Sequence, residues 1–420
     1  MICDIKDLSL ADKGLERILW ADQDMPVLSS IRKRFENEHP LQGIRIAACL
    51  HVTAETANLM RTLKAGGAEV SLCATNSHST QDDTAAALVK YYGIPVFAIK
   101  DEDSQVFYRH IESVIDTLPN ITMDDSATIA GYIHDRRTDA LQTIIGGTEQ
   151  SIAGALRLVS MSKQNTLKYP IITINEAKTK RLIDNRYGTG QSTLDGIIRA
   201  TNRLIAGKTI VVSGYGWCGQ GLAEKARGMG AHVIICEVDP LKALEAIMDG
   251  FNVMPAVEAA SECDIWITAT GNIKAIDGPM FEALKDGAII CNAGHFNTEI
   301  NIPWLEENAV DHKTLRPNVE EYTLENGKQF VLLAEGRLVS LSCAEGNPAS
   351  VMDMNYANLA LSADYLIKNA SELTVHCYDV PEDINTHLAN LKLKTLGVQI
   401  DSLTQEQIQY LNTWDIDIVS

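Results

Sequence analysis

Three glycines recur at a spacing suited to a nucleotide phosphate: Gly214, Gly216 and Gly219, in Gly-Tyr-Gly-Trp-Cys-Gly. An apolar run precedes them, and a second apolar run ends in Glu237, 23 residues after the first glycine. In a strand–turn–helix unit these glycines permit a tight turn, close approach of a pyrophosphate, and close helix–strand packing. Glu237 would bind the ribose hydroxyls and repel a 2′-phosphate, so the pattern predicts NAD. The alternative is a glycine turn that serves packing alone.

Four polar clusters follow predicted strands, at the edge where open α/β sheets bind ligands. They are 51–55 (His51, Thr53, Glu55), 76–83, 180–185 (Lys180, Asp184, Asn185) and 292–297 (His295). Each also has a structural alternative. Thr53, Ser79 or Thr80 could cap a helix. His51 could be a structural histidine, and the lysine and aspartate of the third cluster could form an exposed i,i+4 ion pair. Spacing alone names no reaction.

The elements that must position these clusters alternate between short apolar runs and amphipathic helices. Predicted strands are 44–50, 68–74, 95–99, 141–146, 171–174, 209–213, 233–237, 265–270, 288–292 and 338–342. Their apolar residues are consecutive, which is typical of parallel strands buried on both faces by helices. A helix is predicted over 53–64, and a polar, glycine-containing crossing over 185–192. The sequence therefore predicts an α/β fold with two doubly wound domains, a substrate domain and a Rossmann domain, and a short C-terminal helical extension.

Bulk composition excludes several classes of protein. A chain of 420 residues exceeds the usual size of one core, and its net charge of −19 argues against a nucleic-acid or membrane partner. We expect no signal peptide, because the N-terminus lacks a basic segment followed by an apolar one. The nine cysteines are scattered without a CxxC pair, so we expect reduced thiols in a cytoplasmic protein and no metal site.

Taken together, the motifs resemble the adenosylhomocysteinase (S-adenosylhomocysteine hydrolase) family over nearly the whole chain. The segments that carry the resemblance are 51–56, 79–83, 179–192, 214–219, 237–246, 269–272 and 294–296. The resemblance implies that NAD⁺ oxidises the 3′-hydroxyl of the nucleoside to a ketone, which acidifies the 4′ C–H. β-Elimination then expels the thiol from C5′, water adds, and the hydride returns. It also implies a homotetramer that acts on a small nucleoside.

The resemblance assigns roles residue by residue. The implied catalytic residues are Lys180, which takes the 3′-hydroxyl proton, Asp184, which orients it, Asp125 for the 4′ proton, and His51 and His295 for the 5′ position. The implied cofactor-binding residues are Asn185, Ser151, Gly214, Gly216, Gly219, Glu237 and Asn272. The implied substrate-binding residues are Thr53, Glu55, Gln150 and Asn347. The implied domains are 1–185 and 346–385 for substrate, 186–345 for NAD, and 386–420 for oligomerisation.

Several positions depart from the family pattern. Gln150 replaces a glutamate that grips the ribose, Asn347 replaces a histidine at the nucleobase, and Ser340 replaces an asparagine near the nicotinamide. An amide in place of a carboxylate gives up a charge-assisted hydrogen bond worth about 1.5–3 kcal/mol. Three hypotheses follow: hydrolysis of S-adenosylhomocysteine, the same chemistry on another nucleoside (S-inosylhomocysteine, or a dehydration), or an inactive NAD-binding regulator.

Overall fold

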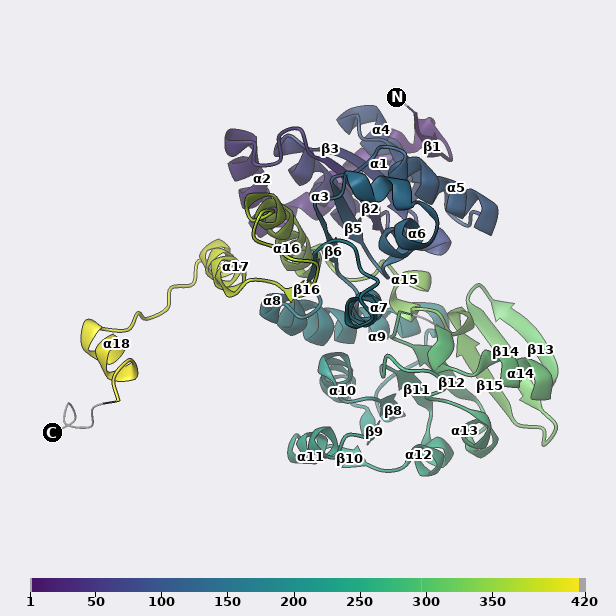
Figure 1. The fold of residues 1–420 in the computed structure, drawn as a ribbon. Coiled ribbons are helices and arrows are strands. Elements are labelled where there is room, and N and C mark those ends of the chain that lie inside the picture. Colours follow the sequence, from purple (N-terminus) through teal and green to yellow (C-terminus); the bar gives the residue numbers. More distant parts are fainter. Residues whose placement is uncertain (1, 296, 415–420) are drawn as a thin grey trace.

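Two eight-stranded sheets organise the chain in the computed structural model, which describes residues 2–295 and 297–414 (Figure 1). The first sheet has the order β1 (Asp4–Ile5), β4 (Val96–Ala98), β3 (Glu69–Ala74), β2 (Arg45–Leu50), β5 (Ile121–Asp124), β6 (Gly146–Glu149), β7 (Ile171–Thr173) and β16 (Cys377–Asp379). Its neighbouring strands pair in parallel. The second sheet has the order β10 (Asn252–Val253), β9 (His232–Cys236), β8 (Thr209–Ser213), β11 (Ile265–Thr268), β12 (Ala288–Asn292), β15 (Gln329–Leu333), β14 (Val319–Leu324) and β13 (Ala309–Arg316).

Alternate residues of the central strands enter different cores. In β2, Ile46 packs in one hydrophobic cluster and its neighbour Ala47 in another, and in β8, Ile210 and Val211 divide in the same way. Because successive side chains of a strand point to opposite faces, both faces of each sheet are buried. The consecutive apolar residues of these strands follow from this burial. The prediction of two doubly wound α/β units is confirmed.

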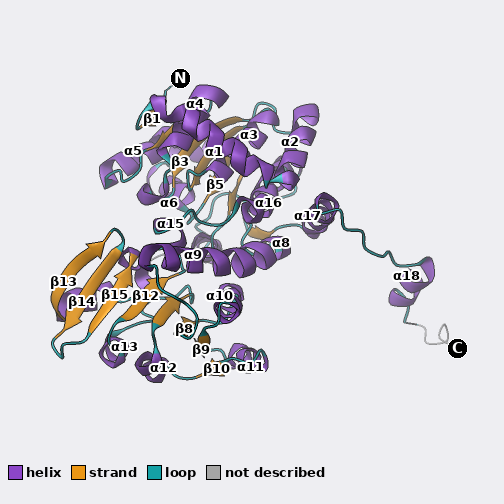
Figure 2. Cartoon of the chain, turned by 180° about the vertical axis from the view of Figure 1, so that it is seen from behind, coloured by secondary structure: helices purple, strands orange, loops and turns teal. Residues whose placement is uncertain are grey.

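Helices cover both sheets (Figure 2). Those around the first sheet are α1 (Ala11–Gln23), α2 (Pro26–Glu38), α3 (Ala54–Ala65), α4 (Asp82–Tyr92), α5 (Ser104–Ile115), α6 (Thr128–Arg136), α7 (Ile152–Lys163) and α16 (Ala349–Lys368). Those around the second are α10 (Trp217–Gly228), α11 (Pro240–Met248), α12 (Ala256–Glu262), α13 (Gly278–Ala283) and α14 (Ile302–Asn308). Residues of α16 pack into the core of the first unit, and β16 pairs with β7. The chain thus returns to the first unit after completing the second.

The predicted crossing at 185–192 is helical. α8 (Lys178–Lys180), a π-helical segment η4 (Arg181–Gly188) and α9 (Thr189–Thr201) follow one another without a loop. Close helix contact accounts for glycine in this region: a Cβ on Gly221 of α10 would lie 1.8 Å from the backbone oxygen of Arg186. The segment therefore passes between the two units as packed helix.

Two predicted strands are wrong. The run 141–146 overlaps a short 3₁₀ helix (Thr138–Gln142) and ends where β6 begins, and the run 338–342 forms α15 (Val339–Ser342). The sequence also did not predict β5 or the antiparallel strands β13–β15. A short apolar run does not distinguish a strand from a buried helical turn, and β5 ends in Asp124 with Asp125 directly after it, so its apolar run is short.

A C-terminal extension leaves the body of the molecule. α17 (Glu382–Thr395) packs on α16, whereas α18 (Gln405–Leu411) stands away from both units in two opposite views (Figures 1 and 2). The nine cysteines are free thiols. Within the described residues, no helix has the length and apolarity needed to cross a membrane.

Candidate active site

A cavity of about 250 Å³ lies between the two units, and residues from both line it. From the first unit, His51, Asp125 and Gln150 follow the carboxyl ends of β2, β5 and β6. From the second, Gly271 and His295 follow β11 and β12. Parallel strands end at the same edge of a sheet, so facing edges bring these loops together. The predicted residues that line the cavity are His51, Thr53, Glu55, Asp125, Gln150, Ser151, Lys180, Asp184, Asn185, Asn272, His295 and Asn347.

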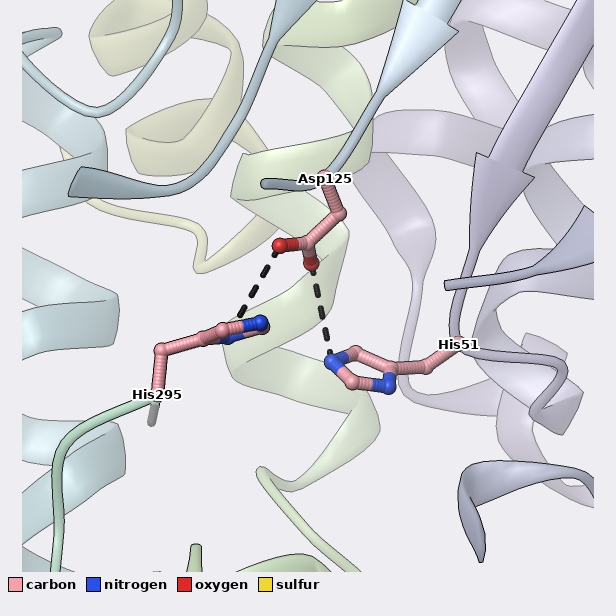
Figure 3. Close-up of side chains that lie close together, drawn as sticks. All are labelled: His51, Asp125 and His295. Atoms are coloured by element: carbon pink, nitrogen blue, oxygen red, sulfur yellow. Dashed lines mark ion pairs between the residues drawn. The ribbon is translucent and has the colours of Figure 1, made fainter. Parts of the chain in front are cut away.

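Two histidines face one carboxylate in this cavity (Figure 3). His51 Nε2 lies 3.5 Å from Asp125 Oδ2, and His295 Nδ1 lies 3.8 Å from Asp125 Oδ1. On its other side, His51 Nδ1 bonds Ser79 Oγ at 2.7 Å, and His295 Nε2 bonds Ser126 Oγ at 2.5 Å. The three residues come from segments 74 and 170 positions apart in the chain, counted from residue 51 to 125 and from 125 to 295.

Burial and charge shift the protonation of this group. Burial lowers the pKa of His51 more than the Asp125 carboxylate raises it, so the ring is neutral at neutral pH. Burial opposes ionisation of Asp125, but the two histidines, with Gln150 and Lys180, outweigh it and lower the pKa of that carboxyl. Gln150 Nε2 donates to Asp125 Oδ2 at 2.7 Å. The neighbouring Asp124 differs: burial raises its pKa to about 7.

A buried glutamate shapes the loop that carries Asp125. Glu149 accepts hydrogen bonds from the backbone N–H groups of Ser126 (3.1 Å) and Ala127 (2.7 Å). Both residues have positive φ, 74° and 54°, a region that L-residues other than glycine rarely occupy. Burial raises the pKa of Glu149 well above its usual value. Ser151 Oγ donates to Glu149 at 2.6 Å and accepts from Gly154 N at the start of α7, so it ties this carboxylate to a helix cap.

The lysine of the site lies on the crossing helix, buried with its partners. Lys180 Nζ lies 2.7 Å from Asn185 Oδ1, 3.1 Å from Asn175 Oδ1 and 3.3 Å from Asp184 Oδ2. The π-helical turn after Lys180 brings residues five apart onto one face, which aligns it with Asn185. Asn347 Nδ2 donates to Asp184 Oδ1 at 2.6 Å. The alternative of an exposed surface pair is wrong, because Lys180 and Asp184 are each only 7% exposed.

The helix-cap alternative holds for Thr53 and fails for Ser79. Thr53 does cap α3, accepting from Thr56 N at 3.5 Å, and it also lines the cavity beside Glu55. Burial raises the pKa of the Glu55 carboxyl. Ser79 caps no helix: its hydroxyl donates to Asn76 O at 2.9 Å, and α4 begins after Gln81 without a side-chain cap. The second cluster therefore positions His51.

The three glycines of the predicted phosphate turn have distinct surroundings. Gly214 has φ +95°, and a Cβ on it would lie 2.7 Å from Ala269 O. A Cβ on Gly219 would lie 1.9 Å from Gly214 O, whereas one on Gly216 would meet no atom within 4 Å. The turn thus requires glycine for geometry at two positions and keeps open space at the third. Glu237 closes the turn by accepting Tyr215 N at 2.7 Å, and α10 presents its N-terminus to it. These features fit a bound dinucleotide.

Sequence reasoning missed several residues that line the cavity, among them Asn175, Glu299, Asn355 and Tyr356. Asn175 comes almost directly after β7, so the strand-end rule used for the other clusters would have found it. Asn355 Nδ2 donates to Gln150 Oε1 at 3.2 Å from the middle of α16, where nothing in the local sequence signals a site.

Comparison with known proteins agrees with this arrangement. Residues 3–144 match the family model described as S-adenosyl-L-homocysteine hydrolase, and residues 185–346 match its NAD binding domain. The chain is 57% identical over 413 residues to an adenosylhomocysteinase of Aquifex aeolicus, covering 98% of this chain and 99% of the relative. The chain belongs to the S-adenosyl-L-homocysteine hydrolase family.

Other relatives support the same assignment. An adenosylhomocysteinase of Saccharolobus solfataricus is 55% identical over 411 residues, covering 98% of each chain. Among solved structures, a dipicolinate synthase from Bacillus halodurans superposes with a TM-score of 0.50 at 14% identity, covering 79% of this chain and all of that one. At that identity the likeness concerns the fold alone. The resemblance expected from the motifs to the S-adenosyl-L-homocysteine hydrolase family is confirmed.

Proposed function

We propose that this chain catalyses the NAD-dependent hydrolysis of S-adenosylhomocysteine to adenosine and homocysteine. The observation that carries the proposal is that a buried lysine and a histidine–aspartate–histidine group line one cavity. The two relatives described above are named adenosylhomocysteinase, and the match covers nearly their full length. NAD held at the glycine turn would accept a hydride from C3′ of the ribose and later return it.

Residues that line the cavity divide the proton transfers between them. Lys180 accepts the proton of the 3′-hydroxyl, and Asp184, held by Asn347, orients that hydroxyl. Asp125 accepts the proton from C4′ once the neighbouring carbon is a ketone. His51 and His295 protonate the leaving sulfur at C5′ and activate the attacking water. Closure of the two units around the substrate would exclude bulk water while the ketone exists.

The remaining predicted residues bind the two ligands. Thr53 and Glu55 read the edge of the base, and Gln150 and Asn347 hold the ribose and base from the other side. Gly214, Gly216, Gly219 and Glu237 hold the adenosine half of NAD. Asn185, Asn272 and Ser151 lie in the cavity wall. Asn185 would contact the nicotinamide side of NAD, and Asn272 and Ser151 would help to hold the cofactor.

A thiol-release assay tests the proposal. The purified protein with NAD⁺ is incubated with S-adenosylhomocysteine, S-inosylhomocysteine or adenosine, and free thiol and bound NADH absorbance are followed. We expect thiol release from the adenosyl substrate. Activity on S-inosylhomocysteine alone, or NADH formation without thiol, would replace this substrate with another nucleoside. Absence of NADH with every nucleoside would indicate a regulator without activity.

A pair of lysine variants controls this assay. Lys180→Ala should abolish NADH formation and retain NAD, because the lysine contacts the site and not the glycine turn. Lys178→Ala, on the same short helix, removes an exposed lysine that pairs with Glu382 at 2.8 Å, and it should leave turnover unchanged. Turnover that survives in Lys180→Ala would refute the assigned base.

We infer further that the protein is a cytoplasmic homotetramer, with substrate domain 1–185 plus 346–385, NAD domain 186–345, and oligomerisation through 386–420. Support comes from the C-terminal extension, which exposes Leu403, Ile408, Leu411 and Trp414 although these side chains are apolar. The free thiols suit a reducing compartment. Light scattering during size-exclusion chromatography measures the mass of the assembly and tests whether it is a tetramer.

A further inference from the structure

The serine hydroxyls beside the two active-site histidines determine which ring nitrogens carry protons. Ser79 Oγ donates its proton to Asn76 O at 2.9 Å, so it accepts from His51 Nδ1–H at 2.7 Å. Ser126 Oγ donates to Asp125 Oδ1 at 3.3 Å, so it accepts from His295 Nε2–H at 2.5 Å. In the neutral rings, His51 Nε2 and His295 Nδ1 are therefore the unprotonated nitrogens. Both face the two oxygens of one carboxylate (Figure 3).

The lone pairs of His51 Nε2 and His295 Nδ1 face those of the Asp125 carboxylate, and a cation between them would relieve their repulsion. The separations of 3.5 Å and 3.8 Å exceed a hydrogen-bond length. A second buried histidine shows the contrast: His110 Nε2 lies 3.0 Å from Asp4 Oδ2, as expected when a proton occupies the gap. The ligand atoms of His51, Asp125 and His295 all lie within 4.8 Å of one another. Their spacing is wider than a proton requires and close to what a metal ion requires.

We propose that His51 Nε2, His295 Nδ1 and an oxygen of Asp125 bind one divalent transition-metal ion, and that this ion inhibits the enzyme reversibly. Two nitrogens and one carboxylate oxygen suit Zn²⁺ or Co²⁺ better than Mg²⁺ or Ca²⁺. Ligands at about 2.0–2.1 Å from Zn²⁺ lie about 3.4 Å apart in a tetrahedron, so small inward movements complete the site. The two serines supply the outer hydrogen bonds that orient metal-binding imidazoles. The sequence predicted no metal site, because its ligands are far apart in the chain.

A smaller cavity of about 20 Å³ is lined by His51, His295, Asn76, Ser79 and Arg337 among others. A bound ion would occupy the electron pairs that the proposed mechanism uses to accept protons, which is why binding inhibits. The inhibition rests on the proposed function, whereas the binding does not.

Metal binding is measured directly on the holoenzyme. Co²⁺ is titrated by its visible absorbance, and Zn²⁺ by equilibrium dialysis, both without substrate. We expect one ion per chain, with affinity lowered at least about 100-fold in His51→Asn and in His295→Asn. Ser79→Ala should weaken binding about 10–100-fold, because it removes an outer hydrogen bond. His312→Gln, which alters an exposed histidine of β13 that pairs with Glu320, should bind as the unaltered protein does.

The outcomes separate the site from the proposed function. Far-UV circular dichroism and NAD content show which variants are folded. Because His51 and His295 belong to different units, the test still stands if one of the two histidine variants fails to fold. Absence of binding, or binding unchanged in both histidine variants, would overturn the site. Thiol release that continues with the ion bound would overturn the inhibition. Binding that depends on both histidines in a protein without activity would uphold the site and refute the proposed function alone.

Discussion

Gly219→Ala provides a quantitative test of the phosphate turn. The added Cβ would lie 1.9 Å from Gly214 O, and an ordinary contact needs about 3.4 Å, so backbone must move by about 1.5 Å. The atom in the way is a carbonyl of the turn itself, which cannot rotate aside as a side chain does. Forcing atoms into a packed site costs about 1–3 kcal/mol. The same movement distorts the surface that would bind the pyrophosphate.

Gly228→Ala is the matched control. Gly228 ends the same helix, and its Cβ would meet no atom within 4 Å. Both substitutions gain about 0.5–1 kcal/mol from the higher helix propensity of alanine. The propensity gains nearly cancel between the two variants, so their difference in stability isolates the clash, about 1–3 kcal/mol.

Thermal unfolding and NAD content give the readout. For a unit of about 160 residues, 1 kcal/mol shifts the Tm by about 2–4 °C, so Gly219→Ala should melt about 2–12 °C below Gly228→Ala. Gly219→Ala should also lose bound NAD, measured by chromatography of the nucleotide released from denatured protein. Equal melting temperatures and equal NAD content in the two variants would refute the close approach of this helix to the turn.

Three other features of the molecule can be tested in the same way. Gly216→Ala should leave the Tm of the NAD-free protein unchanged, since its Cβ enters open space, yet reduce NAD content; retained NAD would show that nothing approaches this glycine. Burial opposes protonation of His110, but Glu102 and Asp4 outweigh burial and raise the pKa of the ring. The protonated ring therefore stabilises the folded protein at pH values below the pKa of the unfolded state. This stabilisation is lost as the pH rises through the pKa of the folded state. His110→Gln should therefore cost about 1.5–3 kcal/mol at pH 6 and less at pH 9 in urea unfolding; a constant cost would contradict the charged state. A chain that ends at residue 395 should keep its far-UV circular dichroism spectrum, but light scattering should show a smaller assembly. An unchanged mass would show that residues after 395 do not form the contact between subunits.

Much of the site was predictable because strand ends mark it. The buried runs before His51 and before His295 are strands, and both histidines lie in the cavity that the strand-end rule predicts. Asp125 was assigned only through resemblance, since the short strand β5 contains Thr122 and Asp124 and lacks a continuous apolar run. The predicted strand at 338–342 is helical from Val339 to Ser342, because a short run with only three apolar residues buries equally well in either form.

The parallel-sheet class, the glycine turn with its acid and the membership of the family were all readable along the chain, because they depend on local residue types and spacing. Which polar groups meet became visible only in the folded molecule. The contact of Lys180 with Asn185 depends on a π-helical turn, and the tautomers of His51 and His295 depend on serines brought to them by other strands and loops. A hydrogen bond acts over about 3 Å, and no pattern along the chain specifies distances of that size between side chains of separate segments.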